Sequence, residues 1–493
     1  MNDPRAASQV RTASGWPELV SVALLGTERR APPPPADPAL ADLADAASQR
    51  SAEERLLSAA GALAVLRRAG RLAPPAPPLP APAPAEARPA CGAAAAYRLT
   101  LLLDDQRALL PEWLRAVAGR GLRVPAGRLP DLLEAATANQ ALRGDVEPVL
   151  GERGPWLAAQ VPRWSWAAPL PATAAEREAL WLTGTRPQRH RLFALLRRTR
   201  PDEARQLLYQ GLAREEAADR AWFIAALGAG LAPADEPLLE TALDDRRQEV
   251  RAAAARTLAR LPGSAFARRM TDRTVPLVRV DGGGISVALP EDLDEAAIRD
   301  GVIRRPSSGT GERAWWLHQL VAATPLSAWY TVGLEPEQAA TLPVTGDLEA
   351  PLRRGFAQAA DAQRDPRWAT AFLDVSPRLA EFADRRQAAL AGLEHLRAGE
   401  TGIADSLRAP WPRELSEGAL GLLVRLADRD GGPAGPAAGH WVHRLIAERL
   451  DPALAGEAAR RLESIEPGTP QARQARELVR TLSFRREMYE ELS

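Results

Sequence analysis

Apolar residues recur at helical spacing through the middle of the chain. In the segment 247–261, Val250, Ala254 and Leu258 are each four residues apart, so they share one face of a helix. Similar segments come in pairs with a period of about 30 residues, and a pair that cannot bury its apolar face alone must stack on its neighbours. The pattern therefore predicts stacked helical repeats. The expected helices are 174–182, 188–198, 202–212, 217–228, 236–243 and 247–261.

The helical pattern stops near residue 275, where β-forming residues flank Asp281-Gly282-Gly283-Gly284. Val278 and Val280 precede this run and Ile285 follows it, which predicts a β-hairpin inserted between helical blocks. A glycine-rich run can also cradle a phosphate. This one lacks the Lys and the Ser or Thr of a P-loop, and a strand rather than a helix follows it. We therefore interpret it as a tight turn.

Proline-rich stretches divide the N-terminal part of the chain. Ser51 and Glu54 form a capping-box signature for a helix that runs to about Ala69. Alternating Pro and Ala over 74–89 predict an extended spacer, which is a simpler interpretation than a ligand for a proline-reading domain. We expect six segments: an N-terminal helical segment (1–73), a Pro/Ala-rich linker (74–90), a Trp-rich helical region (91–173), helical repeats (174–271), a hairpin and loop insertion (272–311) and a C-terminal helical array (312–493).

Composition narrows the possible function classes. The 493 residues include 63 basic and 63 acidic side chains, and a net charge of zero disfavours a surface adapted throughout to nucleic acid. One Cys excludes a disulfide framework and a Cys-based zinc site. The longest nearly unbroken apolar run, 221–232, is shorter than the roughly 18 residues of a membrane span. No signal-peptide cleavage pattern follows the apolar stretch 19–26, so we expect a cytoplasmic protein.

No constellation of residues in the sequence identifies a reaction. His440 and His443 are spaced to share a helical face, but no third metal ligand has a suitable spacing. The sequence also contains no nucleophile elbow and no kinase signature. We therefore predict no catalytic residue, no metal and no cofactor.

Arginine is the only basic residue besides histidine, and it recurs in doublets. Doublets that line one face would touch phosphates, and about 6–10 such contacts make binding steeply salt-dependent. The simpler interpretation is pairing with acids between repeats and on solvated helix faces. The doublets are 197–198, 246–247, 268–269, 304–305, 353–354 and 385–386. The residues that we single out as candidates for binding are Arg246, Arg247, Arg251, Trp315 and Trp316.

Two resemblances add to this interpretation. Residues 235–261, with Asp244-Asp245, Val250-Arg251 and the alanines that follow, resemble a HEAT repeat, a family in which Asp and Arg often pair between adjacent repeats. Nearly the whole chain is similar to an uncharacterised bacterial family, catalogued as a domain of unknown function. The segments that carry this second resemblance are 23–29, 110–114, 154–157, 244–251, 261–264 and 315–329.

The residue pattern and the resemblances together predict a mostly α protein, a HEAT-like α-solenoid with a small β-hairpin insertion. Genes of the larger family often neighbour genes for a SWIM zinc-finger protein, a MoxR-type AAA ATPase and a von Willebrand A-domain protein. That neighbourhood implies that a MoxR-type AAA ATPase or a von Willebrand A-domain protein is a partner, and that the protein works beside an ATPase-driven system. The family supplies no catalytic residue.

We therefore expect a non-catalytic scaffold or adaptor that binds other proteins, because solenoids expose extended binding surfaces. The alternative is a nucleic-acid-binding HEAT-like protein, similar to DNA-repair glycosylases, in which a base-holding aromatic cleft and a positioned acid are needed. The placement of the arginines distinguishes the two. Clustering along one groove favours nucleic acid, whereas dispersal among acids favours a scaffold.

Overall fold

The computed structural model describes residues 16–33, 49–69, 80–281, 283–306, 309, 311–427, 444–463, 465 and 468–492. It divides the chain into two compact units, Met1–Pro82 and Ala83–Ser493. Helices dominate both units, which confirms the expected mostly α class. None of the described helices is long and apolar enough to cross a membrane.

The first unit contains a pair of helices, α2 (Trp16–Leu25) and α4 (Ala52–Ala69), which contact each other. Helix α4 begins with the predicted capping box. The Ser51 backbone N–H donates to Glu54 Oε2 at 3.1 Å, and the Glu54 N–H donates to Ser51 Oγ at 3.2 Å. These two bonds satisfy backbone donors that a helix start would otherwise leave without a partner.

The second unit begins with short helices that share one core. They are α5 (Ala93–Asp104), α6 (Leu110–Gly119), α7 (Leu129–Ala138), α8 (Arg143–Val146) and α9 (Arg153–Gln160). Five short 3-10 helices connect or follow them: η2 (Arg107–Leu109), η3 (Ala126–Arg128), η4 (Gln140–Leu142), η5 (Glu147–Val149) and η6 (Pro162–Ala167).

The helices that follow match the predicted pairs closely. They are α10 (Ala174–Thr183), α11 (Arg186–Thr199), α12 (Pro201–Gly211), α13 (Ala217–Ala226), α14 (Glu236–Ala242) and α15 (Gln248–Leu258), with η7 (Leu212–Arg214) and η8 (Pro233–Asp235) between them. Helix α11 contacts α12 and α13, and α13 contacts α15. The apolar stripe that includes Val250, Ala254 and Leu258 is buried, as the spacing predicts.

The predicted hairpin is present after α16 (Ala265–Thr274) and η9 (Val275–Leu277). Strand β1 (Val278–Asp281) pairs antiparallel with β2 (Gly284–Val287), with Val280 opposite Ile285. A contact outside the prediction holds the hairpin to the body: the Ile285 N–H donates to the carbonyl of Pro343 at 2.8 Å. Gly284 allows this approach, because a Cβ there would lie 2.7 Å from the same carbonyl oxygen.

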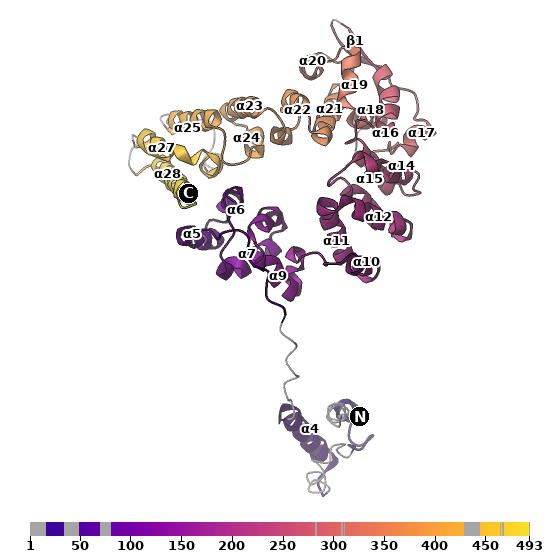
Figure 1. Cartoon of the computed structure of the whole chain (residues 1–493), viewed down its shortest axis with the longest axis vertical. Coiled ribbons are helices and arrows are strands. Elements are labelled where there is room, and N and C mark those ends of the chain that lie inside the picture. The colour runs from indigo at the N-terminus through magenta and orange to yellow at the C-terminus, as the bar shows by residue number, and fades with distance from the viewer. Residues whose placement is uncertain are drawn as a thin grey trace. The chain divides into compact units, whose positions relative to one another are not determined.

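The remaining helices continue to the C-terminus, and the last of them contacts the beginning of the unit. The order is α17 (Glu295–Arg299), α18 (Glu312–Ala323), α19 (Leu326–Trp329), η10 (Tyr330–Val332), α20 (Pro336–Thr341), α21 (Glu349–Gln363), α22 (Pro366–Ala371), η11 (Pro377–Glu381), α23 (Arg385–Arg397), α24 (Gly402–Ser406), α25 (Arg413–Ala427), η12 (Pro452–Leu454), α27 (Ala455–Leu462) and α28 (Pro470–Glu490). In Figure 1 these helices follow a curved path, and α28 returns beside α5 and α6.

The return of α28 is fixed by buried groups. Met488 and Leu492 belong to the apolar core of α5–α9, although they lie more than 300 residues further along the chain. The guanidinium of Arg485 forms two hydrogen bonds with the Glu112 carboxylate of α6, at 2.8 and 2.9 Å. Arg98 of α5 pairs in turn with Glu487 and Glu491. The second unit is therefore closed on itself through its first and last helices.

Helices α18 and α21 pack unusually closely, because Gly355 faces Val321 across the contact. A Cβ at Gly355 would lie 2.7 Å from Val321 Cβ. We expect Gly355→Ala to lower the free energy of unfolding by about 1–3 kcal/mol, because the two helices must move apart. Urea unfolding followed by circular dichroism measures the change. Gly421→Ala in α25, where the nearest atom to a new Cβ is 3.7 Å away, is the control and is expected to stabilise by up to about 1 kcal/mol.

Candidate binding site

The five residues singled out from the sequence lie near the start of α15 and in the first turns of α18. Arg246 and Arg247 are exposed, and Arg247 lies 3.9 Å from Glu249. The Arg251 guanidinium donates to the backbone carbonyls of Asp245 (2.8 Å) and Arg246 (3.2 Å). Arg251 thus closes the loop before α15, and it also lines a small hollow of about 250 Å³ together with Arg304 and Arg305.

The neighbouring tryptophans of α18 have different surroundings. Trp316 is buried in the core, and its indole Nε1 donates to the Arg304 carbonyl at 2.7 Å, so it holds the preceding loop in place. Trp315 is half-buried and lines a second, larger hollow. Its indole Nε1 is buried and has no hydrogen-bond partner among the described residues.

The arginine doublets are dispersed among acids rather than gathered along one groove. Arg197 forms a fully buried pair with Asp235, and Arg198 pairs with Glu147. Ion pairs also engage Arg247, Arg269, Arg304, Arg305 and Arg353. Within the described part of the chain, Arg246, Arg268, Arg354, Arg385 and Arg386 form no ion pair.

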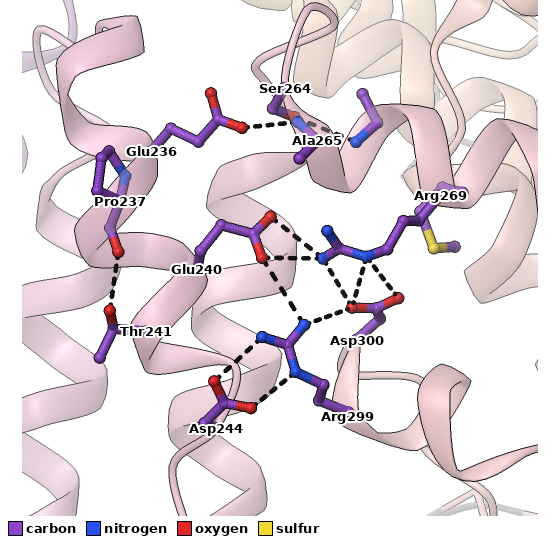
Figure 2. Close-up of polar contacts among 12 residues, drawn as sticks. Glu236, Pro237, Glu240, Thr241, Asp244, Ser264, Ala265, Arg269, Arg299 and Asp300 are labelled. Carbon is purple, nitrogen blue, oxygen red and sulfur yellow. Dashed lines mark hydrogen bonds and ion pairs between the residues drawn. The ribbon is translucent and has the colours of Figure 1, made fainter.

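The largest group of connected ion pairs among the described residues joins α14, α16 and α17. Figure 2 shows Arg269 between Glu240 and Asp300, and Arg299 between Asp244 and Asp300. Hydrogen bonds to Asp300 raise the pKa of Arg269 above its ordinary value. Asp300 is buried and also accepts from Arg273 at 3.1 Å, so its negative charge is fully matched by arginines. This network positions the loop 300–303.

The larger hollow lies next to this loop and is lined by residues of α15, α18 and α21. Its volume is about 560 Å³. Helix α15 contributes Arg256, and Arg260 lies two residues beyond its end. Helix α18 contributes Trp315, His318 and Gln319, and α21 contributes Gln358 and Asp361, while Arg364 and Phe382 come from the segments beyond α21. Gln319 joins the wall to the loop, since its amide accepts from the Ile303 N–H at 2.8 Å and donates to the Ile303 carbonyl at 3.0 Å. Much of the remaining lining is alanine: Ala252, Ala255, Ala259, Ala322, Ala323 and Ala362.

Positive charge exceeds negative charge around the hollow. Among the described residues, the side chains of Arg256, Arg260 and Arg364 form no ion pair and no hydrogen bond. Burial lowers the pKa of Arg260, the nearby Arg364 lowers it further, and Asp361 opposes the change. The Arg364 guanidinium lies 5.2 Å from the ring centre of Phe382, within the range of a cation–π contact. The site therefore holds three guanidinium groups against one uncommitted carboxylate.

His318 adds no charge to this surface near neutral pH. Burial lowers its pKa below 6.5, a hydrogen bond with Gln358 raises it, and the charge of Arg354 lowers it again. Its ring centre lies 5.6 Å from that of Trp315. His318 and Trp315 thus form one uncharged, aromatic wall of the larger hollow.

Of the five candidates predicted from the sequence, only Trp315 lines this hollow. Arg256, Arg260 and Arg364 also line it, but they were not among the candidates. A signal for two of them was present. Arg256 and Arg260 are four residues apart in the helix predicted over 247–261, a spacing at which like charges repel. Ala252, the preceding position on the same stripe, supplies no acid.

No group of three or more His, Cys, Asp or Glu side chains among the described residues is arranged to hold a metal ion. His440 and His443 lie outside the described residues.

Comparison with known proteins gives one match. The model of a family described as "Family of unknown function (DUF5691)" matches residues 18–492, nearly the whole chain. No curated protein and no solved structure matches the chain significantly.

Proposed function

We propose that this chain, which belongs to the Family of unknown function (DUF5691), is a non-catalytic cytoplasmic scaffold or adaptor that binds other proteins. The observation that carries the proposal is the dispersal of the arginine doublets among acids. Arginines that pair with carboxylates inside the fold have fewer hydrogen-bond donors, and less uncompensated charge, to offer to phosphates. A scaffold needs such pairs, because they hold neighbouring helices in one arrangement.

A HEAT-like α-solenoid accounts for the spacing of these pairs. Arg177 pairs with Glu203, Arg220 with Asp245 and Arg269 with Asp300, at separations of 26, 25 and 31 residues. Each separation is close to the repeat of about 30 residues that joins one helix pair to the next. Arg220 and Asp245 connect α13 to the loop before α15, as Asp and Arg do between adjacent HEAT repeats.

The family resemblance makes a MoxR-type AAA ATPase or a von Willebrand A-domain protein the first partner to test. The alternative function is nucleic-acid binding, including a role similar to that of a DNA-repair glycosylase. The uncommitted arginines around the larger hollow are the observation that favours this alternative, because unpaired guanidinium groups attract phosphates.

Affinity capture of the tagged full-length chain from its native cells tests the proposal. Capture is run at low and at moderate salt, with and without nuclease. We expect a defined protein that withstands both treatments and forms a stoichiometric complex again when the two purified proteins are mixed, as measured by size-exclusion chromatography with light scattering. Recovery of nucleic acid alone, decreasing as salt rises, would overturn the scaffold and favour the alternative.

A further inference from the structure

We propose that the hollow over α15, α18 and α21 is the docking site for an acidic segment of the protein partner, with carboxylate side chains on Arg256, Arg260 and Arg364 and an apolar side chain against Trp315. The proposal rests on the proposed scaffold function and names the chemistry that its partner must carry. We call this site the arginine hollow; its residues are those described above.

The excess of positive charge in the arginine hollow favours the binding of an anion. The charge of Arg364 disfavours the charge of Arg260, and no carboxylate of the described residues forms an ion pair with either side chain. Asp300 also borders the site, but its oxygens are engaged by Arg269 and Arg273. A guanidinium presents its donors in a fork that matches a carboxylate, so a bound carboxylate would form the charge-assisted bonds that the fold leaves unmade.

The remaining lining favours a peptide over a simple ion. Trp315, Phe382 and the alanine floor offer apolar and aromatic surface beside the arginines. The amides of Gln319 and Gln358 face the same space, and His318 is neutral near pH 7. A pocket of about 300–1,000 Å³ suits a drug-sized group. The volume of about 560 Å³ therefore accommodates a few side chains of a peptide.

The charge of Asp361 favours a peptide over a nucleic acid as the occupant of the arginine hollow. Its carboxylate lies in the wall of the arginine hollow and would repel a chain that carries a negative charge at every residue. A peptide avoids this repulsion, because its backbone N–H groups can donate to the Asp361 oxygens while its own acidic side chains reach the arginines. Mixed charge in the wall thus favours a segment in which acidic and apolar residues alternate.

A fluorescein-labelled peptide of alternating glutamate and phenylalanine is the probe, and its binding to the full-length chain is followed by fluorescence anisotropy. We expect the glutamate peptide to bind more tightly than the same peptide with glutamine. A charge-assisted hydrogen bond contributes about 1.5–3 kcal/mol, so Arg260→Gln should weaken binding about tenfold or more. Arg364→Gln, which changes an exposed side chain, is expected to weaken it in the same direction and replaces Arg260→Gln if that variant does not fold.

Two further variants make the test specific. Arg386→Gln removes an arginine that is also exposed but lies outside the arginine hollow, and it should leave the affinity unchanged. Asp361→Asn removes the opposing carboxylate, so it should strengthen binding of the glutamate peptide, a gain that loss of structure does not produce. Equal weakening by Arg386→Gln, or no gain with Asp361→Asn, would overturn the proposal.

Competitors identify the occupant and separate the two proposals. Displacement of the peptide by oligothymidylate, or by inorganic phosphate at the same concentration as unlabelled peptide, would assign the hollow to nucleic acid or to small anions and overturn the acidic segment. In the complex with the captured protein, Arg260→Gln or Arg364→Gln should weaken association. A complex that forms equally well with both variants refutes the docking site and leaves the scaffold standing, whereas failure to capture any protein partner refutes the scaffold itself.

Discussion

Replacing Arg485 with methionine is expected to lower the free energy needed to separate α28 from α6 by about 3–5 kcal/mol, because it leaves Glu112 as an uncompensated buried charge. Arg485 and Glu112 have side chains that are 0% and 3% exposed. The same guanidinium donates to the carbonyls of Ala447 (3.0 Å) and Leu450 (2.6 Å), and Tyr489 donates to Glu112 at 3.0 Å. Burial and the charge of Glu112 raise the pKa of Tyr489, so its hydroxyl keeps the proton that it donates.

Hydrogen–deuterium exchange at the backbone amides of α6 and α28 measures this effect, because separation of the two helices exposes them without requiring the whole chain to unfold. The control is Arg486→Met, which removes an exposed arginine one residue further along, paired only with Glu490. Its expected effect is at most about 0.5 kcal/mol. The double variant Glu112→Leu with Arg485→Met should recover much of the loss, because no charge then stays buried. Equal protection in Arg485→Met and Arg486→Met would contradict the prediction.

The contact between Glu112 and Arg485 could not be predicted from the sequence, unlike the helices that precede the hairpin. The helices α10–α15 and the hairpin were predictable, since apolar spacing and turn residues are local signals. Glu112 and Arg485 are 373 residues apart, and nothing in the periodicity around either residue distinguishes it from the many other acids and arginines. The prediction therefore described the repeated helices without the closure that joins the two ends of the second unit.

The candidate site was predictable only in part, for a related reason. Successive residues of a helix are about 100° apart around its axis, so one of two adjacent tryptophans can lie in the core while the other borders a surface. The sequence does not say which, and the structure buries Trp316 while Trp315 lines the arginine hollow. Arg364 was harder still to single out, because it lies just beyond the end of α21 and outside its helical spacing. Its backbone turns there, with a φ of 52°. The candidates Arg246 and Arg247 stay outside the hollow, and their role in binding stays a prediction.

Asp235→Asn is expected to lower the free energy of unfolding near neutral pH by about 3–5 kcal/mol, because it leaves the buried Arg197 without its counter-charge. Both side chains are fully buried. The Asp235 carboxylate accepts two hydrogen bonds from Arg197, at 3.0 and 2.8 Å, and one from Arg205 at 2.9 Å. It also accepts the Ala232 N–H at 3.0 Å. The loss of this one charge therefore disturbs the turn before α14 as well as its link to α11.

The pH dependence gives this prediction a second readout. Burial raises the pKa of Asp235, but the hydrogen bonds from Arg197 and Arg205 outweigh burial and hold it below its ordinary value of 3.8. A carboxyl whose pKa is lowered by folding stabilises the fold above its ordinary pKa, and this contribution is lost as the pH falls towards the lowered value. The difference between wild type and Asp235→Asn should therefore be constant near neutrality and shrink below about pH 4.

Urea unfolding midpoints across this pH range measure the difference. Asp202→Asn is the matched control, because Asp202 also pairs with Arg205, at 2.8 Å, but its side chain is 84% exposed. Its expected cost is at most about 1 kcal/mol. If Asp202→Asn and Asp235→Asn cost the same, burial does not decide the strength of these pairs. The arginine–acid pairs between helices would then be incidental to the stacking, and the main support for the scaffold proposal would be lost.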